Sequence, residues 1–297
     1  MKWRPLSRRE SAKDAEAYDV LHDGIPRWLQ ASVSNWIERV LATLCERDNY
    51  AAQLVAGYDS NEDRYRDLLL YIERELRLTL ERTSAAAARK DLLEQAVEDP
   101  KVGLDVVDLL LSYLSASRHY AKEQLADELN AFLYQGGSKW CVSAGRDSLE
   151  ERVALEAAER AAQLTTAGTR AGEHLREAWH SVYGRNPNPS HAYREAVRGV
   201  EVAAIPVVSP KNDKATLGTI IRDMKAAPKK WKVSLQPAKG DPVEHVIGMM
   251  ELLWTAQFDR HGTADESVPL SVGAEEAEAA IHLALTLTHW FQTGIVR

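Results

Sequence analysis

Residues 27–48, RWLQASVSNWIERVLATLCERD, decide the fold class, because their apolar side chains recur with the period of an α-helix. These side chains follow one another mostly at spacings of three and four: Trp28, Leu29, Val33, Trp36, Ile37, Val40, Leu41 and Leu44. Such spacing gives an amphipathic helix one broad apolar face. Pro26 precedes the segment, where its fixed φ suits a first helical turn. The segment therefore predicts a helix that must pack onto others.

The helical period continues through most of the chain. It predicts further helices over residues 61–82, 84–99, 103–116, 120–133, 189–208, 213–227, 242–258 and 274–292. The helices of the N-terminal half have too little apolar cover to be stable alone, so we expect them to pack on one another. The last segment is apolar on nearly every side, which is typical of a central buried helix. The fold class expected from these patterns is all-α.

A change in amino-acid composition near Gly145 predicts two domains. The chain has 297 residues, more than one compact helical core usually organises. Beyond the change, residues 148–184 are rich in alanine and nearly free of helix breakers, so we expect one long helix there. The prediction is an N-terminal helical domain over residues 1–145 and a second helical domain over residues 146–297.

One small β-ribbon is also expected. Residues 139–143, KWCVS, alternate as a brief extended segment does, and residues 231–236, WKVSLQ, form another β-like run between prolines. We expect these two runs to pair with each other. Within residues 213–227, Asp213 is the expected N-cap of the helix.

Composition and missing motifs exclude several classes of protein. Apolar residues make up 45% of the chain and charged residues 27%, the balance of an ordinary folded protein. No apolar run approaches the roughly eighteen residues of a membrane helix, so we expect a cytoplasmic protein without membrane contact. Cys45 and Cys141 are far apart, which argues against a disulfide framework or a cysteine zinc site. Motifs for dinucleotides, nucleoside triphosphates, zinc proteases and serine hydrolases are absent, so no cofactor and no metal are expected.

Positive charge is concentrated in one part of an otherwise acidic chain. The net charge is −7, yet residues 184–232 contain ten lysines and arginines against four acidic residues. Arg185, Arg194, Arg198 and Lys214 are the candidate contacts for the phosphates of RNA. The alternative is that these side chains form the solvated face of ordinary helices.

Three segments together resemble a known family. They are residues 178–225 (AWHSVYGRNPNPSHAYREAVRGVEVAAIPVVSPKNDKATLGTIIRDMK), 249–263 (MMELLWTAQFDRHGT) and 275–294 (EEAEAAIHLALTLTHWFQTG). In this order they resemble the C-terminal half of bacterial proteins related to abortive-infection (Abi) phage-defence proteins, which are similar to the HEPN helical superfamily. Residues 23–41, DGIPRWLQASVSNWIERVL, resemble the N-terminal helical domain of Abi-like proteins less specifically.

The resemblance implies a phage-defence protein with a C-terminal HEPN-like helical bundle. Many HEPN domains form dimers that cleave RNA without metal through an Arg-x(4–6)-His motif, whereas others only bind RNA or protein. Two functions therefore stay open. The chain is either a metal-independent endoribonuclease acting as a homodimer, or a non-catalytic helical module that binds RNA or a partner protein of a defence system.

The first candidate catalytic pair is Arg260 and His261. The pair precedes the last predicted helix, where the family carries its motif, although here the two residues are adjacent and not spaced. Histidine exchanges a proton near neutral pH, and the arginine fork fits phosphate, so such a pair suits cleavage of RNA by its own 2′-OH. The structural alternative is a helix end, with both cations favoured at the C-terminus and Gly262 in the C-cap.

The second candidate catalytic pair is Arg185 and His191, which satisfies Arg-x(5)-His. Pro187 and Pro189 lie between them, so the structural alternative is a turn in which Asn188 caps the following helix and Pro189 occupies its first position. In that geometry Arg185 and His191 need not converge.

Other histidines are weaker candidates. His174, Glu177 and His180 are spaced so that the two imidazoles diverge on a helix, and no third metal ligand accompanies them. His282 and His289 share a face of the last helix and could reach His261, but core histidines with satisfied hydrogen bonds are the alternative.

A homodimer contact is expected from the aromatic residues near the ends of the last two helices. These are Trp254, Phe258, Trp290 and Phe291.

Overall fold

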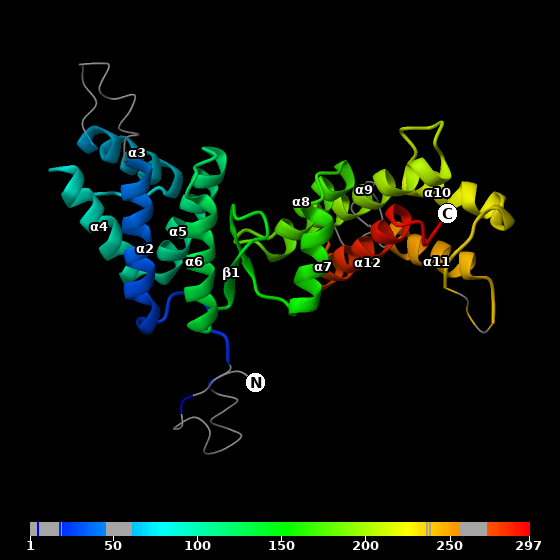
Figure 1. The fold of residues 1–297 in the computed structure, drawn as a ribbon, viewed down its shortest axis with the longest axis horizontal. Helices are drawn as coiled ribbons and strands as arrows, with labels where there is room; N and C mark the ends of the chain where they lie inside the picture. The colour runs from blue at the N-terminus through cyan, green and yellow to red at the C-terminus, as the bar shows by residue number, and fades with distance from the viewer. Residues whose placement is uncertain are drawn as a thin grey trace, which may run out of the picture. The chain divides into compact units, whose positions relative to one another are not determined.

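The structure is a computed structural model, and it describes residues 5, 18, 20–45, 61–235, 237, 239–255 and 272–297. The chain divides into two compact units, Met1–Arg152 and Val153–Arg297. The division falls seven residues beyond the boundary predicted from the change in composition. The all-α fold class is confirmed, with one two-stranded ribbon in the described residues (Figure 1). Within those residues, no helix has the length and apolar character needed to cross a membrane.

The first unit consists of helices followed by the ribbon. Its elements are α2 (Arg27–Cys45), α3 (Asn61–Leu76), α4 (Ala85–Glu98), α5 (Pro100–Ala116), α6 (Lys122–Gln135), β1 (Trp140–Val142) and β2 (Leu149–Glu151).

Helix α2 contacts α3, α4, α5 and α6 through the apolar face that its sequence predicts. Trp36 is fully buried in this core, and its indole N–H donates to the carbonyl of Leu125 in α6 at 2.8 Å. Trp28 is the exception on the predicted face, because its side chain is exposed and donates instead to the carbonyl of Gly136 at 3.0 Å. Burial of a tryptophan with its one donor satisfied stabilises the helix contact without an unpaired polar group.

The ribbon pairs partners other than those expected. β1 runs antiparallel to β2, with Trp140 opposite Glu151 and Val142 opposite Leu149. The prediction that KWCVS pairs with residues 231–236 is wrong, since Val233 forms a bridge with Val296 instead. The short loop between β1 and β2 makes the local pairing easier to close than a distant one, because loop closure costs entropy.

The second unit contains the remaining helices. They are α7 (Leu155–Thr165), α8 (Arg170–Tyr183), α9 (Pro189–Val208), α10 (Leu217–Ala226), the short 3₁₀ helix η2 (Pro228–Lys230), α11 (Pro242–Thr255) and α12 (Ala274–Gln292).

Helix α9 is the centre of this unit and packs against α8, α10 and α12 (Figure 1). A Cβ atom at Gly199 would lie 2.9 Å from the Leu175 side chain of α8, so glycine permits the close approach of these two helices. The phenol of Tyr193 is buried and donates to the carbonyl of Leu253 in α11 at 2.9 Å. Ile281, Leu285 and other residues on several faces of α12 are buried, as the apolar sequence predicts. The first turn of this helix is exposed.

The single long helix predicted over residues 148–184 does not form. The segment contains β2, then α7, then α8, and the last two are separated at residues 166–169. Gly168 has a φ of +65°, which ends the helical path, and the Thr169 side chain caps α8 by accepting from the N–H of Gly172. The break lets α8 fold back against α7, which a continuous helix would prevent.

Other helix limits also differ from the predictions, most of all at α10 and α3. α10 begins at Leu217, and its N-cap is Thr216 rather than Asp213. α3 ends at Leu76, earlier than the predicted limit at residue 82, because Arg77 adopts a positive φ of 54°. The freed residues 77–84 form a loop that leads to Ser84, the N-cap of α4.

Candidate functional site

The first candidate catalytic pair, Arg260 and His261, lies outside the described residues, as do Phe258 and Gly262. The described part of α11 ends at Thr255, and α12 resumes the chain at Ala274. Glu276 of α12 accepts from the backbone N–H of Gly273 at 2.8 Å, which satisfies a donor at the start of this helix.

The second candidate pair is separated by the turn that its prolines predict. Asn188 is the N-cap of α9 and accepts from the N–H of His191 at 3.1 Å, while Pro189 occupies the first turn. His191 turns its Nε2 towards the carboxylate of Glu177 in α8, at 3.1 Å. Arg185 is half-buried just before the turn. His191 therefore lies in the first turn of α9, and its imidazole contacts the Glu177 carboxylate of α8.

His174 of α8 also reaches a carboxylate. His174 Nδ1 lies 2.6 Å from Glu195 Oε2, and the other oxygen of Glu195 accepts from Arg198 at 2.6 Å. Burial raises the pKa of the Glu195 carboxyl, but the hydrogen bond from His174 and the positive charge of Arg198 together lower it below its usual value. His174 and Glu177 thus turn to different partners on α9. Among the described residues, no group of histidine, cysteine or acidic side chains is arranged to hold a metal ion.

A polar cluster that the sequence does not predict joins α8 to α12. The phenol of Tyr183 donates to Glu278 Oε1 at 3.0 Å and lies 2.9 Å from His282 Nε2. Because the single phenolic proton goes to Glu278, the phenol accepts the N–H of His282. The rings of Trp179 and His282 form a T-shaped contact, with centroids 5.8 Å apart. We call these residues, Tyr183, Glu278 and His282, the α8–α12 cluster, and its imidazole is partly exposed.

His289, the other histidine predicted on this helix face, has a different environment. Burial lowers the pKa of its imidazole, and the positive charge of Arg160 lowers it further. His289 is therefore favoured as a neutral side chain, although it is only partly buried.

Part of the predicted basic surface is neutralised by acidic partners. Arg198 pairs with the buried Glu195, and Arg194 is exposed on the same helix. On α10, Arg222 pairs with Asp223 at 2.9 Å, and Lys225 pairs with Glu251 of α11 at 2.5 Å. Pairing of this kind lowers the net positive potential that α9 and α10 present to a phosphate.

Other cations of the segment stay exposed at the two ends of α10. Lys211 and Lys214 lie in the loop before this helix, and Lys229 and Lys232 follow it. Within the described chain, none of the four ammonium groups has an ion-pair partner. The neighbouring Lys230 places its ammonium 4.5 Å from the centre of the Trp231 ring. We call Lys211, Lys214, Lys229 and Lys232 the α10 lysines.

A cavity of about 450 Å³ adjoins the second pair of these lysines. Lys229, Lys232 and Arg297 contribute positive charge to its lining, and Asp241 contributes one negative charge. The guanidinium of Arg297 is fixed there by bonds to Ser234 Oγ at 3.2 Å and to the carbonyl of Gly294 at 2.8 Å. The cavity therefore carries an excess of positive charge and suits an anionic group such as a phosphate.

Most of the aromatic residues predicted to form a homodimer contact pack in or against the core of the second unit. Phe291 is buried in the core of the second unit, and Trp254 and Trp290 pack against that core. Trp254 lies close to Gly218 of α10, where an added Cβ would meet its ring at 2.8 Å. Less aromatic surface is therefore open to a partner than the sequence predicts.

Comparison of the chain with protein-family models, curated proteins and solved structures finds no match.

Proposed function

We propose that the second unit binds RNA and that the chain acts as an abortive-infection-like defence protein with a HEPN-like C-terminal unit. The observation that carries RNA binding is the set of exposed α10 lysines, together with the positively charged cavity beside Lys229 and Lys232. The arginines of α9 predicted to bind RNA contribute less, because Arg198 is paired with a buried carboxylate.

The geometry of α10 sets the scale of the contact. This helix spans residues Leu217–Ala226, so at 1.5 Å of rise for each residue its two ends are about 15 Å apart. Lysines at both ends can therefore hold different phosphates of one strand. The Trp231 ring next to Lys230 offers an aromatic surface near the second pair, a feature that often accompanies cations in single-strand binding.

The test is the salt dependence of RNA affinity. Fluorescence anisotropy with a labelled single-stranded RNA should give a log-log slope of about −0.7 for each phosphate held. Replacement of Lys229 and Lys232 by glutamine should weaken binding and make the slope shallower by about 0.7 for each phosphate that is no longer held. Binding that is independent of salt would contradict the proposal.

The matched control carries the same change of charge in the first unit. The double variant Lys90→Gln and Lys101→Gln removes two exposed lysines of α4 and α5, and we expect it to leave the slope unchanged. An equal loss of affinity in both double variants would mean that only the total charge matters, and the α10 lysines would then not form a site.

Metal-independent cleavage of RNA is the second candidate function, and the α8–α12 cluster favours it. In such a reaction the 2′-OH attacks phosphorus after giving up its proton, and the leaving 5′-oxygen receives one. His282 is able to carry either proton, and Tyr183 holds its ring in place. His261 and Arg260 are the family-based candidates for the same roles.

Three variants separate these possibilities. Cleavage that persists with a metal chelator is expected to stop in His261→Ala if the family motif acts, or in His282→Ala if the α8–α12 cluster acts. His191→Ala is the control, because His191 pairs with Glu177 at the start of α9. If RNA stays intact with the wild type, the non-catalytic RNA-binding module is the function that remains. Light scattering tests the homodimer, and phage plaque counts on bacteria expressing wild type or His261→Ala test the defence role.

A further inference from the structure

The loop between α3 and α4 encloses a cavity of about 360 Å³ in the first unit. Leu69, Leu70 and Leu80 give it an apolar side. The charged side chains of its lining are Arg66, Glu73, Glu81 and Arg82, of which Glu81 is bonded through Oε1 to backbone N–H groups of its own loop. Ligand pockets range from about 300 to 1,000 Å³, so this volume suits a small ligand. The lining combines apolar area with a few charged groups, as binding sites for small molecules do.

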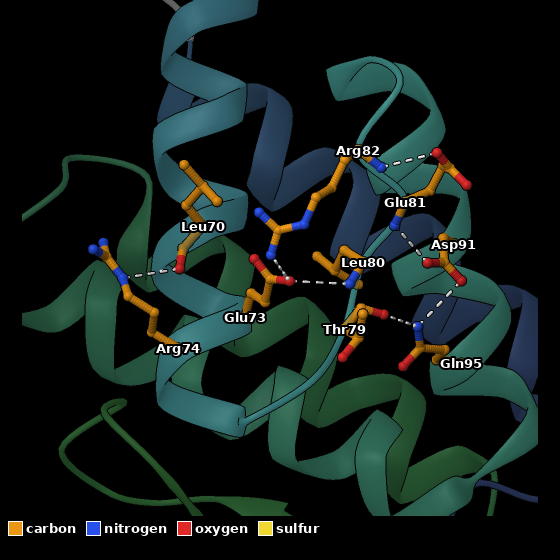
Figure 2. Close-up of polar contacts among 9 residues, drawn as sticks. All are labelled: Leu70, Glu73, Arg74, Thr79, Leu80, Glu81, Arg82, Asp91 and Gln95. Atoms are coloured by element: carbon orange, nitrogen blue, oxygen red, sulfur yellow. Dashed lines mark hydrogen bonds and ion pairs between the residues drawn. The ribbon is translucent and has the colours of Figure 1, made fainter.

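Hydrogen bonds hold the loop on both sides, so the cavity is preformed (Figure 2). Towards α3, Glu73 Oε1 accepts from the N–H of Leu80 at 3.2 Å. Towards α4, Asp91 accepts from the N–H of Glu81 at 2.8 Å, and Gln95 donates to the carbonyl of Thr79 at 2.9 Å. A site held in this way loses little conformational entropy when a ligand enters.

Two of the charged groups of the cavity form an adjacent pair of opposite sign. Arg82 reaches across from the loop and donates to Glu73 Oε1 at 3.0 Å (Figure 2). The Glu73 side chain is only 11% exposed, whereas that of Arg82 is 73% exposed. The bonds from Leu80 and Arg82 both end on Oε1 of Glu73, so its Oε2 remains able to accept, and Arg82 retains guanidinium N–H groups able to donate.

We propose that this cavity binds a free α-amino acid with an apolar side chain. Its ammonium group would contact Glu73, its carboxylate would contact the guanidinium of Arg82, and its side chain would lie against Leu69, Leu70 and Leu80. A zwitterion matches two opposite charges held side by side, whereas a ligand with a single charge would satisfy only one of them. The proposal concerns the first unit alone and is independent of RNA binding by the second.

The experiment compares three ligands on the full-length protein by isothermal titration calorimetry. L-leucine carries both charged groups, 4-methylpentanoate lacks the amine, and 3-methylbutylamine lacks the carboxylate. The wild type should bind L-leucine about ten-fold or more tightly than either analogue, because each analogue contacts only one of the two charged groups, whereas L-leucine contacts both.

Two variants assign the contacts. In Glu73→Gln, the preference for L-leucine over 4-methylpentanoate should disappear, and in Arg82→Gln the preference over 3-methylbutylamine should disappear. Arg74→Gln is the control, since Arg74 is on α3 but donates to the carbonyl of Leu70 and does not line the cavity (Figure 2). Glutamine at residue 73 can still accept from Leu80, and thermal unfolding checks that each variant is folded.

Three outcomes would overturn the proposal. They are a wild type that does not bind L-leucine at millimolar concentration, equal affinities for all three ligands, and variants whose preferences match those of Arg74→Gln. Because Arg82 is mostly exposed, Arg82→Gln is expected to fold even if Glu73→Gln does not, so the carboxylate contact can be tested by itself.

Discussion

Replacement of Glu195 by glutamine tests the buried charge that joins α8 to α9. The carboxylate is 5% exposed as a residue and holds His174 and Arg198 at 2.6 Å each. Glutamine keeps the shape of the side chain but removes its negative charge and replaces one acceptor oxygen by an NH2 group. It keeps both contacts if its oxygen accepts from Arg198 and its NH2 donates to His174 Nδ1, so the perturbation is the loss of the charge and one exchanged donor.

The expected cost follows from these two contacts. A hydrogen bond to a charged group contributes about 1.5–3 kcal/mol and a neutral one about 0.5–1.5, so each bond is weakened by about 1 kcal/mol. The share of Arg198 is smaller, because its side chain is 56% exposed and solvent screens it. Removal of the charge also removes the cost of burying it away from water, which offsets a further part of the lost stability. We expect Glu195→Gln to lower the free energy of unfolding by about 1–2 kcal/mol near neutral pH.

The pH dependence of this stability difference distinguishes the loss of a charge from a steric effect, which would not vary with pH. The folded protein holds the pKa of Glu195 below the ordinary value of 4.5, so the charge stabilises the fold fully above that pH. As pH falls below 4.5 and through the folded pKa, the carboxylate is protonated and this contribution is lost. The difference between wild type and variant should therefore be constant above about pH 5 and shrink as the pH falls through the folded pKa of Glu195.

Urea unfolding followed by circular dichroism at several pH values measures this difference. Glu251→Gln is the control in the same unit, because Glu251 pairs with Lys225 while both side chains are about half exposed. The control should cost less than about 1 kcal/mol at any pH. A difference for Glu195→Gln that does not change with pH, or that equals the control, would refute the assigned role of the charge.

Three further predictions concern packing, capping and thiol chemistry. Gly103→Ala should destabilise the first unit by about 1–3 kcal/mol, because the new Cβ would lie 2.5 Å from the carbonyl oxygen of Ala96. Gly248→Ala should stabilise α11 by about 0.5–1 kcal/mol, because the new Cβ meets nothing within 4 Å. Thermal unfolding measures both changes. Ser84→Ala removes the side chain that caps α4 and should lower the free energy of unfolding by about 1 kcal/mol in the same assay. An unchanged stability would show that this cap does not stabilise the helix. Burial raises the pKa of the Cys141 thiol to about 12, so iodoacetamide should modify it slowly at mildly alkaline pH until the protein is unfolded, and rapid modification of the native protein would contradict that environment.

The parts of the fold that follow from local pattern could be predicted from the sequence. The apolar face of α2 gives its buried side, and Asn188 with Pro189 gives the start of α9. In both cases one helix carries the whole signal in its own residues. The end of α3 carries no such signal, because Arg77 adopts the left-handed conformation without being glycine or asparagine.

Polar contacts between distant segments could not be predicted in the same way. Tyr183 and His282 are 99 residues apart, and no spacing in the sequence indicates that their helices bring them within 2.9 Å. The break between α7 and α8 has a weak signal in Gly168, but alanine-rich sequence on both sides favours a continuous helix. Tertiary packing of α8 against α7 and α9 overrides that local preference.

The basic segment shows why a count of charges does not locate a binding surface. Its local excess of cations includes Arg198, Arg222 and Lys225, yet each of these pairs with a carboxylate, including Glu251, which lies outside the counted segment. The α10 lysines have no such partner among the described residues, and an unneutralised ammonium is what displaces counterions from a phosphate backbone. The salt dependence of RNA binding should therefore follow substitutions of the α10 lysines more steeply than substitution of Arg198, although all of them belong to the same basic segment.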